Sequence, residues 1–314
     1  VDDKGCVYVA DQSAAQIQKY SGDGVLVSTI GDGLVDRPHG VGVDSQGNII
    51  VADRNGGEIF KFDAAGNLVA QWGGHGSEDG QFTLRFGPFQ IAIDDSDGNF
   101  VANIGSEGTG PGQFDGGGPL GITVVGDELF KVQFGRDQIE VFDLDGNFVR
   151  QIADSSGGLN SLTLMEGLGR DPQGNLLVSY NGRVTKIDLI GNELFSFGTR
   201  DTDASVGPGE MAAARQAAAG PDGTMYVVDL YGVVRWGQSG EFLARWGSAG
   251  ERPGQFASPD SIAISELGEL YIAEQANRRV QDFDEDGIFL RSFQPLRPAD
   301  TFPGIFGDMA VASD

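Results

Sequence analysis

Five ionisable residues lie at comparable places in the sequence, each near the start of a short apolar run: His39, Glu166, Arg215, Asp260 and Asp308. Three converging carboxylates would repel one another and attract a hard divalent cation such as Ca²⁺. An arginine beside them would partly neutralise their charge, and a histidine could move protons. We therefore take Glu166, Asp260 and Asp308 as candidate metal ligands, Arg215 and Glu166 as candidate ligand-binding residues, and His39 as a candidate catalytic base. The alternative is a solvated polar channel in which Arg215 pairs with Glu166.

A second carboxylate set has a structural interpretation. Asp11, Asp53 and Asp229 each end an apolar run of the same kind. A residue that recurs in every repeat is typical of turn capping by side-chain to backbone hydrogen bonds, so these aspartates are predicted to be structural. The chain has two histidines, His39 and His75, which excludes a zinc site built from three.

Repeated hairpins supply the elements that would place the first set together. One kind of segment contains an apolar run, a glycine turn and a second apolar run, and it occurs at residues 38–53, 88–103 and 259–274. A second hairpin with a glycine bend follows at residues 58–72, 138–152 and 279–293. Together they predict units of four β-strands, joined by Gly-rich linkers that close on a Phe or Met able to plug between sheets.

The period of these units predicts an all-β propeller formed by residues 1–314 as a single domain. The ends of the second strand are separated by 42, 50, 30, 47, 49 and 45 residues, and four-stranded units of that length are typical of propeller blades. The short step indicates an incomplete blade, or residues absent between Asn103 and Ile104. We expect seven blades with one incomplete, with six as the alternative. The C-terminal run 308–314 is predicted to close the ring by pairing with the N-terminal blade, Met309–Ala312 beside Val7–Ala10.

Several segments resemble NHL repeats. The motifs are GNIIVAD at 47–53, NRRVQDFD at 277–284 and GEFLARWG at 240–247. The resemblance implies a propeller that acts as a recognition platform, often as part of a larger protein. Some relatives bind RNA through a basic face, and a peptide-amidating lyase holds zinc with several histidines. Neither property is expected of this chain, because it has few basic residues and too few histidines.

The amino-acid composition limits the kinds of molecule that the protein is expected to bind. The net charge is −25, from 46 acidic and 21 basic residues, which disfavours nucleic acid and anionic membranes. Fifty glycines argue against a helical protein, and no apolar stretch is long enough to span a bilayer. The chain begins at Val1, and we interpret it as a processed or trimmed piece.

The resulting expectation is a non-enzymatic NHL-type propeller that serves as a rigid recognition or scaffold domain for a protein, peptide or glycan partner. An extracellular, periplasmic or cell-surface location is expected. The alternative is a divalent-metal-dependent hydrolase or lyase, similar to gluconolactonase-like propellers, with its ion at the central channel.

Overall fold

The fold was analysed in a computed structural model of the chain. It describes residues 5–44, 46–76, 91, 106–107, 113–114, 119–133, 138–153, 165–200, 207–294 and 306–312. Within these residues every regular element is a β-strand.

Twenty-four of these strands form six antiparallel sheets of four, each ordered from its innermost to its outermost strand. The first is β28 (Phe306–Ala312), β1 (Cys6–Asp11), β2 (Gln16–Ser21) and β3 (Leu26–Ile30). The second is β4 (Pro38–Val43), β5 (Ile49–Asp53), β6 (Glu58–Phe62) and β7 (Leu68–Gly73). The third is β10 (Pro119–Val125), β11 (Glu128–Gln133), β12 (Gln138–Asp143) and β13 (Phe148–Ala153).

The other three sheets repeat this order. They are β14 (Met165–Arg170), β15 (Leu176–Tyr180), β16 (Arg183–Ile187) and β17 (Glu193–Phe197); β20 (Ala214–Ala219), β21 (Met225–Asp229), β22 (Gly232–Trp236) and β23 (Phe242–Trp246); and β24 (Pro259–Ile264), β25 (Leu270–Glu274), β26 (Arg279–Phe283) and β27 (Phe289–Phe293). Two linkers form short parallel pairs, β8 (Ser106–Glu107) with β9 (Gln113–Phe114) and β18 (Thr199–Arg200) with β19 (Glu210–Met211).

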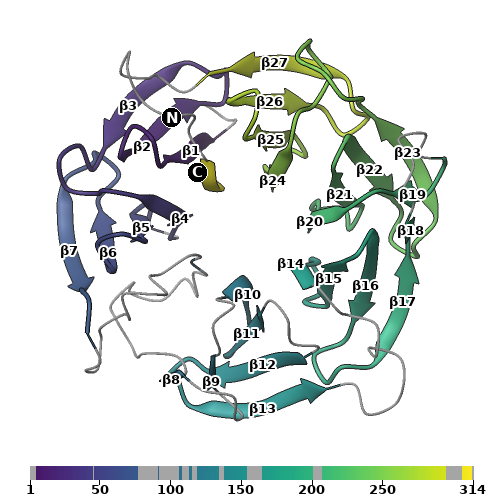
Figure 1. Ribbon diagram of the computed structural model, residues 1–314, viewed down its shortest axis with the longest axis horizontal. Helices are drawn as coiled ribbons and strands as arrows, with labels where there is room; N and C mark the ends of the chain where they lie inside the picture. Colours follow the sequence, from purple (N-terminus) through teal and green to yellow (C-terminus); the bar gives the residue numbers. More distant parts are fainter. Residues whose placement is uncertain are drawn as a thin grey trace.

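The sheets stand as blades around one axis, with the first strand of each nearest the centre (Figure 1). This confirms the predicted β-propeller. Six blades are present among the described residues, which is the alternative count. The additional incomplete blade was predicted from residues 88–103, and these lie almost wholly outside the described part of the chain.

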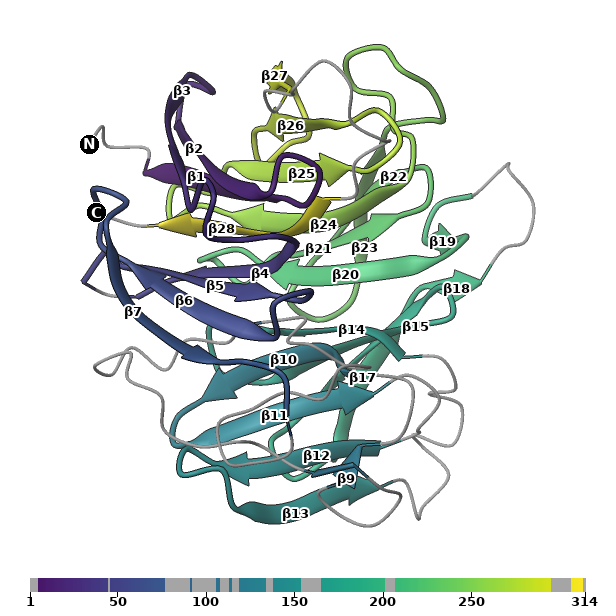
Figure 2. The same cartoon turned by 60° about the vertical axis from the view of Figure 1, so that its left-hand side comes forward.

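The ends of the chain close the ring as predicted. Strand β28 pairs antiparallel with β1, and the register places Val311 opposite Val7 and Met309 opposite Val9 (Figure 2). The closing blade also packs on its neighbour, because the rings of Tyr20 and Phe293 lie 4.5 Å apart between centroids. The first blade is therefore assembled from both extremities of the polypeptide.

The hydrophobic core lies between blades. One cluster joins Phe130 and Val141 of the third blade to Leu176 and Val178 of the next. Every residue of β5, β15, β21 and β25 is buried, because the second strand of a blade is covered on both faces by neighbouring blades. This explains why these strands read as continuous apolar runs in the sequence.

As predicted, the linkers place a Met or Phe side chain between neighbouring blades. Met211 is fully buried in the cluster between the blades that contain β15 and β21. Phe256 is 1% exposed and fills the corresponding place in the next cluster. Trp236 is also buried between blades.

Aspartates cap the turns that connect the first strand to the second and the third to the fourth. The carboxylate of Asp171 accepts hydrogen bonds from the backbone and side chain of Asn175 and pairs with Lys186 at 2.6 Å. Burial opposes ionisation of Asp171, but these contacts outweigh it and hold its pKa below the ordinary value of 3.8. At Asp63 the hydrogen bonds from Asn67 lower the pKa in the same way.

The lowered pKa values of these aspartates predict how the stability of the fold depends on pH. A lowered carboxylate pKa stabilises the fold fully above the ordinary value near 3.8, and that contribution is lost as pH falls through the folded-state pKa. We expect the melting temperature to fall steadily below about pH 4, as Asp44, Asp63, Asp143, Asp171 and Asp188 become protonated. Calorimetry between pH 6 and pH 2.5 would measure this, and a melting temperature that stays level to pH 3 would contradict it.

Candidate recognition face

The innermost strand of each blade carries a β-bulge at its beginning. In β4, Pro38 pairs with Asp53 and Gly40 with Ala52, so His39 is the extra residue. In β24, Asp260 is extra between Pro259 and Ser261. Bulges re-aim side chains and are common beside functional sites.

Four of the five candidate residues lie at these bulges. Besides His39 and Asp260, the extra residue is Glu166 in β14, and it lies within Arg215–Gln216 in β20. In β10 it is Leu120. In β28 the extra residue lies within Gly307–Asp308, and Phe306 is opposite Asp11, as Pro259 is opposite Glu274 in β24. The residue after Phe306 is Gly307, which therefore matches Asp260, and Asp308 lies one residue further along the strand than predicted.

All these positions lie at one end of the ring, which we call the linker end. It carries the blade-to-blade linkers and the turns between the second and third strands of each blade. The opposite end carries the other two turns of each blade, and we call it the turn end. A six-residue strand such as β24 separates the ends by about 20 Å.

An ion pair joins two neighbouring bulges. Arg215 Nη1 lies 3.4 Å from Asp260 Oδ1, and the two side chains are 39% and 35% exposed. Asp260 Oδ2 accepts a hydrogen bond of 2.7 Å from Gln275. The backbone N–H of Ile262 donates to Gln216, which ties the two inner strands together. Arg215 therefore pairs with the following blade in this structure, whereas the solvated-channel alternative paired it with Glu166.

The carboxylates that end the second strands hold the linkers in place. Asp53 accepts hydrogen bonds from the backbone N–H groups of Asp36 and Arg37, at 2.7 and 2.9 Å. Asp229 accepts one from Ala213 at 2.7 Å and pairs with Arg245 at 2.6 Å. These contacts agree with the structural interpretation of the recurrent aspartates.

One blade of the ring matches a known family of sequence repeats. Residues 36–62, which contain β4, β5 and β6, match the model of the NHL repeat. The chain contains an NHL repeat. This confirms the resemblance predicted from the sequence.

The proteins and solved structures that the chain is similar to are distant in sequence. NHL repeat-containing protein 3 of Mus musculus is 26% identical over 126 residues, which is 38% of this chain and 34% of that protein. A chain from the crystal structure of a nidogen/laminin complex is 13% identical, with a TM-score of 0.60 over 98% of both chains. A Bacteroides caccae protein of unknown function has a TM-score of 0.54 at 11% identity, again over 98% of both chains. At these identities the structural likeness shows the fold alone.

The predicted metal ligands can be assessed only in part. Both carboxylate oxygens of Asp260 are engaged, by Arg215 and Gln275, so a cation would have to displace one of them. The side chains of Glu166 and Asp308 lie outside what the structure describes. Among the described residues no three His, Cys, Asp or Glu side chains gather as a metal site requires. A site for Ca²⁺ or another divalent ion stays a prediction, as does the catalytic role of His39, which is half-buried at its bulge.

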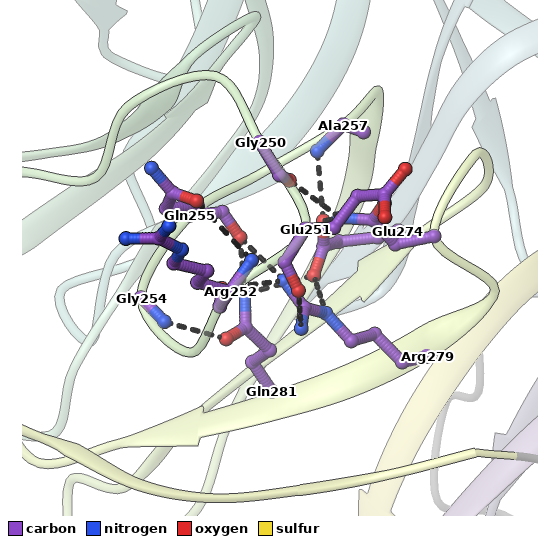
Figure 3. A network of polar contacts seen from close by, with 10 residues as sticks. Gly250, Glu251, Arg252, Gly254, Gln255, Ala257, Glu274, Arg279 and Gln281 are labelled. Carbon is purple, nitrogen blue, oxygen red and sulfur yellow. Dashed lines mark hydrogen bonds and ion pairs between the residues drawn. The ribbon is translucent and has the colours of Figure 1, made fainter.

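The linker at residues 247–258 of the propeller is held by a polar network that the sequence did not reveal (Figure 3). Arg279 is buried and donates to Glu274, to the carbonyls of Glu251 and Arg252, and to that of Gln255. The sequence signal was the pair of adjacent arginines in the NRR motif, which the repeat pattern alone does not distinguish from surface charge.

Further side chains complete this network. Gln281 donates to the carbonyl of Gln255 at 2.9 Å and accepts from the N–H of Gly254 at 2.9 Å. Asn277 donates to the carbonyl of Gly250 at 2.8 Å. The loop backbone is thus held by Asn277, Arg279 and Gln281, while the side chains of Glu251, Arg252 and Pro253 are exposed. Such a loop can offer side chains to a partner with little loss of conformational entropy.

No helix of the described residues has the length and apolar character needed to cross a bilayer.

Proposed function

We propose that this NHL propeller is a recognition domain that binds a protein partner across the linker end of its ring. One observation carries the proposal. The same backbone bulge recurs in the six inner strands, yet the residue type at it varies: His39, Leu120, Glu166, Asp260, Gly307, and the Arg215–Gln216 pair. A constant frame that displays varied chemistry is typical of binding surfaces built on a rigid scaffold.

Rigidity supports the same proposal. The linkers that surround the bulges are fixed by buried carboxylates at Asp53, Asp229 and Glu274 and plugged by Met211 and Phe256. Surfaces that are already ordered lose less entropy on binding, so more of the contact energy appears as affinity. Catalysis is not required to explain any contact described at this end.

A protein is favoured as the partner over a peptide or glycan. The similar nidogen/laminin structure is a complex of two proteins, so a chain of this fold occurs in such an assembly. That likeness concerns the fold, and it supports the proposal only as an analogy.

The test uses two bulky substitutions at opposite ends of one strand. Asp260→Trp changes the bulge of β24 at the linker end, whereas Glu266→Trp makes the same kind of change in the exposed turn that follows β24. The immobilised propeller would be incubated with extract of its source cells, and retained proteins would be quantified by mass spectrometry. We expect Asp260→Trp to reduce retention of a specific protein by at least about tenfold, because a bulky side chain disrupts the fit of an interface, and Glu266→Trp to leave it unchanged.

Two results would contradict the proposal. Equal loss of retention in both variants would place binding away from the linker end. A rise of several degrees in melting temperature on adding millimolar Ca²⁺, abolished by Asp260→Asn, would favour the metal-dependent alternative.

A further inference from the structure

The two ends of the ring differ sharply in charge. The described turns of the turn end contain fourteen acidic residues and no lysine or arginine. They are Asp23, Asp44, Asp63, Asp127, Asp145, Asp171, Asp188, Asp222, Glu241, Glu266, Glu269, Asp284, Glu285 and Asp286. The described turns of the turn end are therefore uniformly acidic, whereas the described linker end carries both carboxylates, such as Asp36 and Glu251, and arginines.

Five arginines at the linker end have no acidic partner within the ranges that the structure describes. The set comprises Arg37, Arg183, Arg200, Arg252 and Arg278. Among the described residues, no carboxylate lies within 4.0 Å of any of these guanidinium groups. The guanidinium group of Arg37 donates to the amide oxygen of Gln12, at 2.9 Å. Arg183, Arg200 and Arg252 are exposed, and the other two are half-buried.

This lack of pairing is informative in a chain with 46 acidic and 21 basic residues. Arginines elsewhere in the fold do find carboxylates. Arg235 pairs with Asp286 at 2.7 Å and Arg291 with Asp282 at 2.5 Å. Where acidic residues are in such excess, five guanidinium groups at one end that have no carboxylate partner in the described part of the chain can be contacted by an anionic partner.

Position and rigidity suit these arginines to contact a large partner. They belong to three separate sectors of the ring: the linker before β4, the blade of β14–β17 with its following linker, and the blade of β24–β27 with its preceding linker. A small anion could not reach all three. Arg252 is carried by the loop whose carbonyls are held by Arg279, so its position is fixed before binding.

The chemistry of the partner follows from the guanidinium group. Its planar array of donors binds carboxylate or phosphate oxygens in pairs. Nucleic acid is disfavoured, because its closely spaced phosphates would be repelled by a protein of net charge −25. Leu34, 49% exposed in the linker before β4, adds the apolar contact that is usual in protein interfaces.

We infer that the partner binds through a carboxylate-rich protein surface, which contacts the linker-end arginines while the turn end remains in solvent. This inference rests on the proposed recognition function and specifies its partner. At physiological salt the Debye length is about 8 Å, whereas the turn-end carboxylates lie about 20 Å away, so the arginines act on a partner largely without that opposing field.

A labelled polyglutamate peptide is a direct probe of this chemistry. We expect fluorescence anisotropy in 150 mM salt to detect its binding to the full chain. The triple variant Arg37→Gln, Arg252→Gln, Arg278→Gln should weaken it at least about tenfold, since each lost charge-assisted contact has a sizeable effect. Arg170→Gln, an exposed arginine at the turn end, is the matched control and should change affinity less than about twofold.

Absence of peptide binding, or binding that the triple variant leaves intact, would overturn the inference. Arginine-dependent binding of a single-stranded oligothymidine in place of polyglutamate would also overturn it, by identifying a nucleic-acid surface. The recognition function can fail separately. If Asp260→Trp abolishes retention of the native partner but the triple variant does not, recognition stands and the acidic-partner inference falls.

Discussion

Deleting residues 306–314 should remove most of the stability of the propeller. Strand β28 forms the inner edge of the first blade through its pairing with β1. Its loss would expose one edge of β1, in which all six residues are buried, and would remove the contacts of β28 with the neighbouring inner strands β4 and β24. A domain of ordinary stability has about 5–15 kcal/mol in total, so the loss of a closing strand should consume a large share of it. We expect the melting temperature to fall by at least about 10 °C.

A shorter deletion distinguishes the effect of losing strand β28 from the effect of losing the residues that follow it. Deletion of 313–314 alone removes residues beyond β28 and should leave the melting curve unchanged. If the larger deletion yields too little folded protein to measure, a synthetic peptide of residues 306–312 should restore it by strand addition. A truncated chain that melts within about 2 °C of the full one would show that closure does not depend on this strand.

Replacing Glu274 by alanine should be the most damaging single substitution at the linker end. Its carboxylate accepts from Arg279 at 2.6 Å, Gln281 at 2.8 Å, Asn277 at 2.7 Å and the backbone N–H of Ala257 at 2.8 Å. The side chain has no exposed surface, and that of Arg279 is 8% exposed. Removing one partner of a buried pair leaves an uncompensated charge, with a typical cost of about 3–5 kcal/mol.

A double-mutant cycle measures the pair itself. Urea unfolding of Glu274→Ala, Arg279→Leu and the double variant should show that the second change recovers much of the first loss, because both charges are then absent. The exposed neighbour Glu251→Ala is the control and should change the free energy of unfolding by less than about 0.5 kcal/mol. A loss below about 1 kcal/mol for Glu274→Ala would show that the linker is not held by this carboxylate.

Much of the fold could be predicted because it depends on local pattern. Alternating runs with glycine bends define antiparallel hairpins, and a fixed period leaves few ways to bury both faces of each sheet except by stacking blades around an axis. Ring closure followed from the fact that the chain begins with a second strand and ends with a first strand. The plugs Met211 and Phe256 were recognisable for the same reason, since each closes a linker that recurs.

The candidate site was less accessible to such reasoning. Register in β28 gives Gly307 the place that spacing suggested for Asp308, because a bulge shifts the count by one residue and leaves no mark in the sequence. The partner of Arg215 is on the next blade, which is a matter of inter-blade distance. The hydrogen bonds from Arg279 reach linker residues that lie 24 to 28 positions earlier in the sequence. Their acceptors are backbone carbonyls, and because every residue has one, the sequence does not mark these partners.

The amino-acid sequence by itself therefore determined the four-stranded unit, the ring, its closure and the capped turns, because each arises from contacts between neighbouring segments of a repeating pattern. Only the tertiary structure decided which charges are neutralised and which are presented. That outcome depends on how separate blades bring side chains within a few ångströms. It leaves five arginines without carboxylate partners among the described residues at one end of an acidic ring.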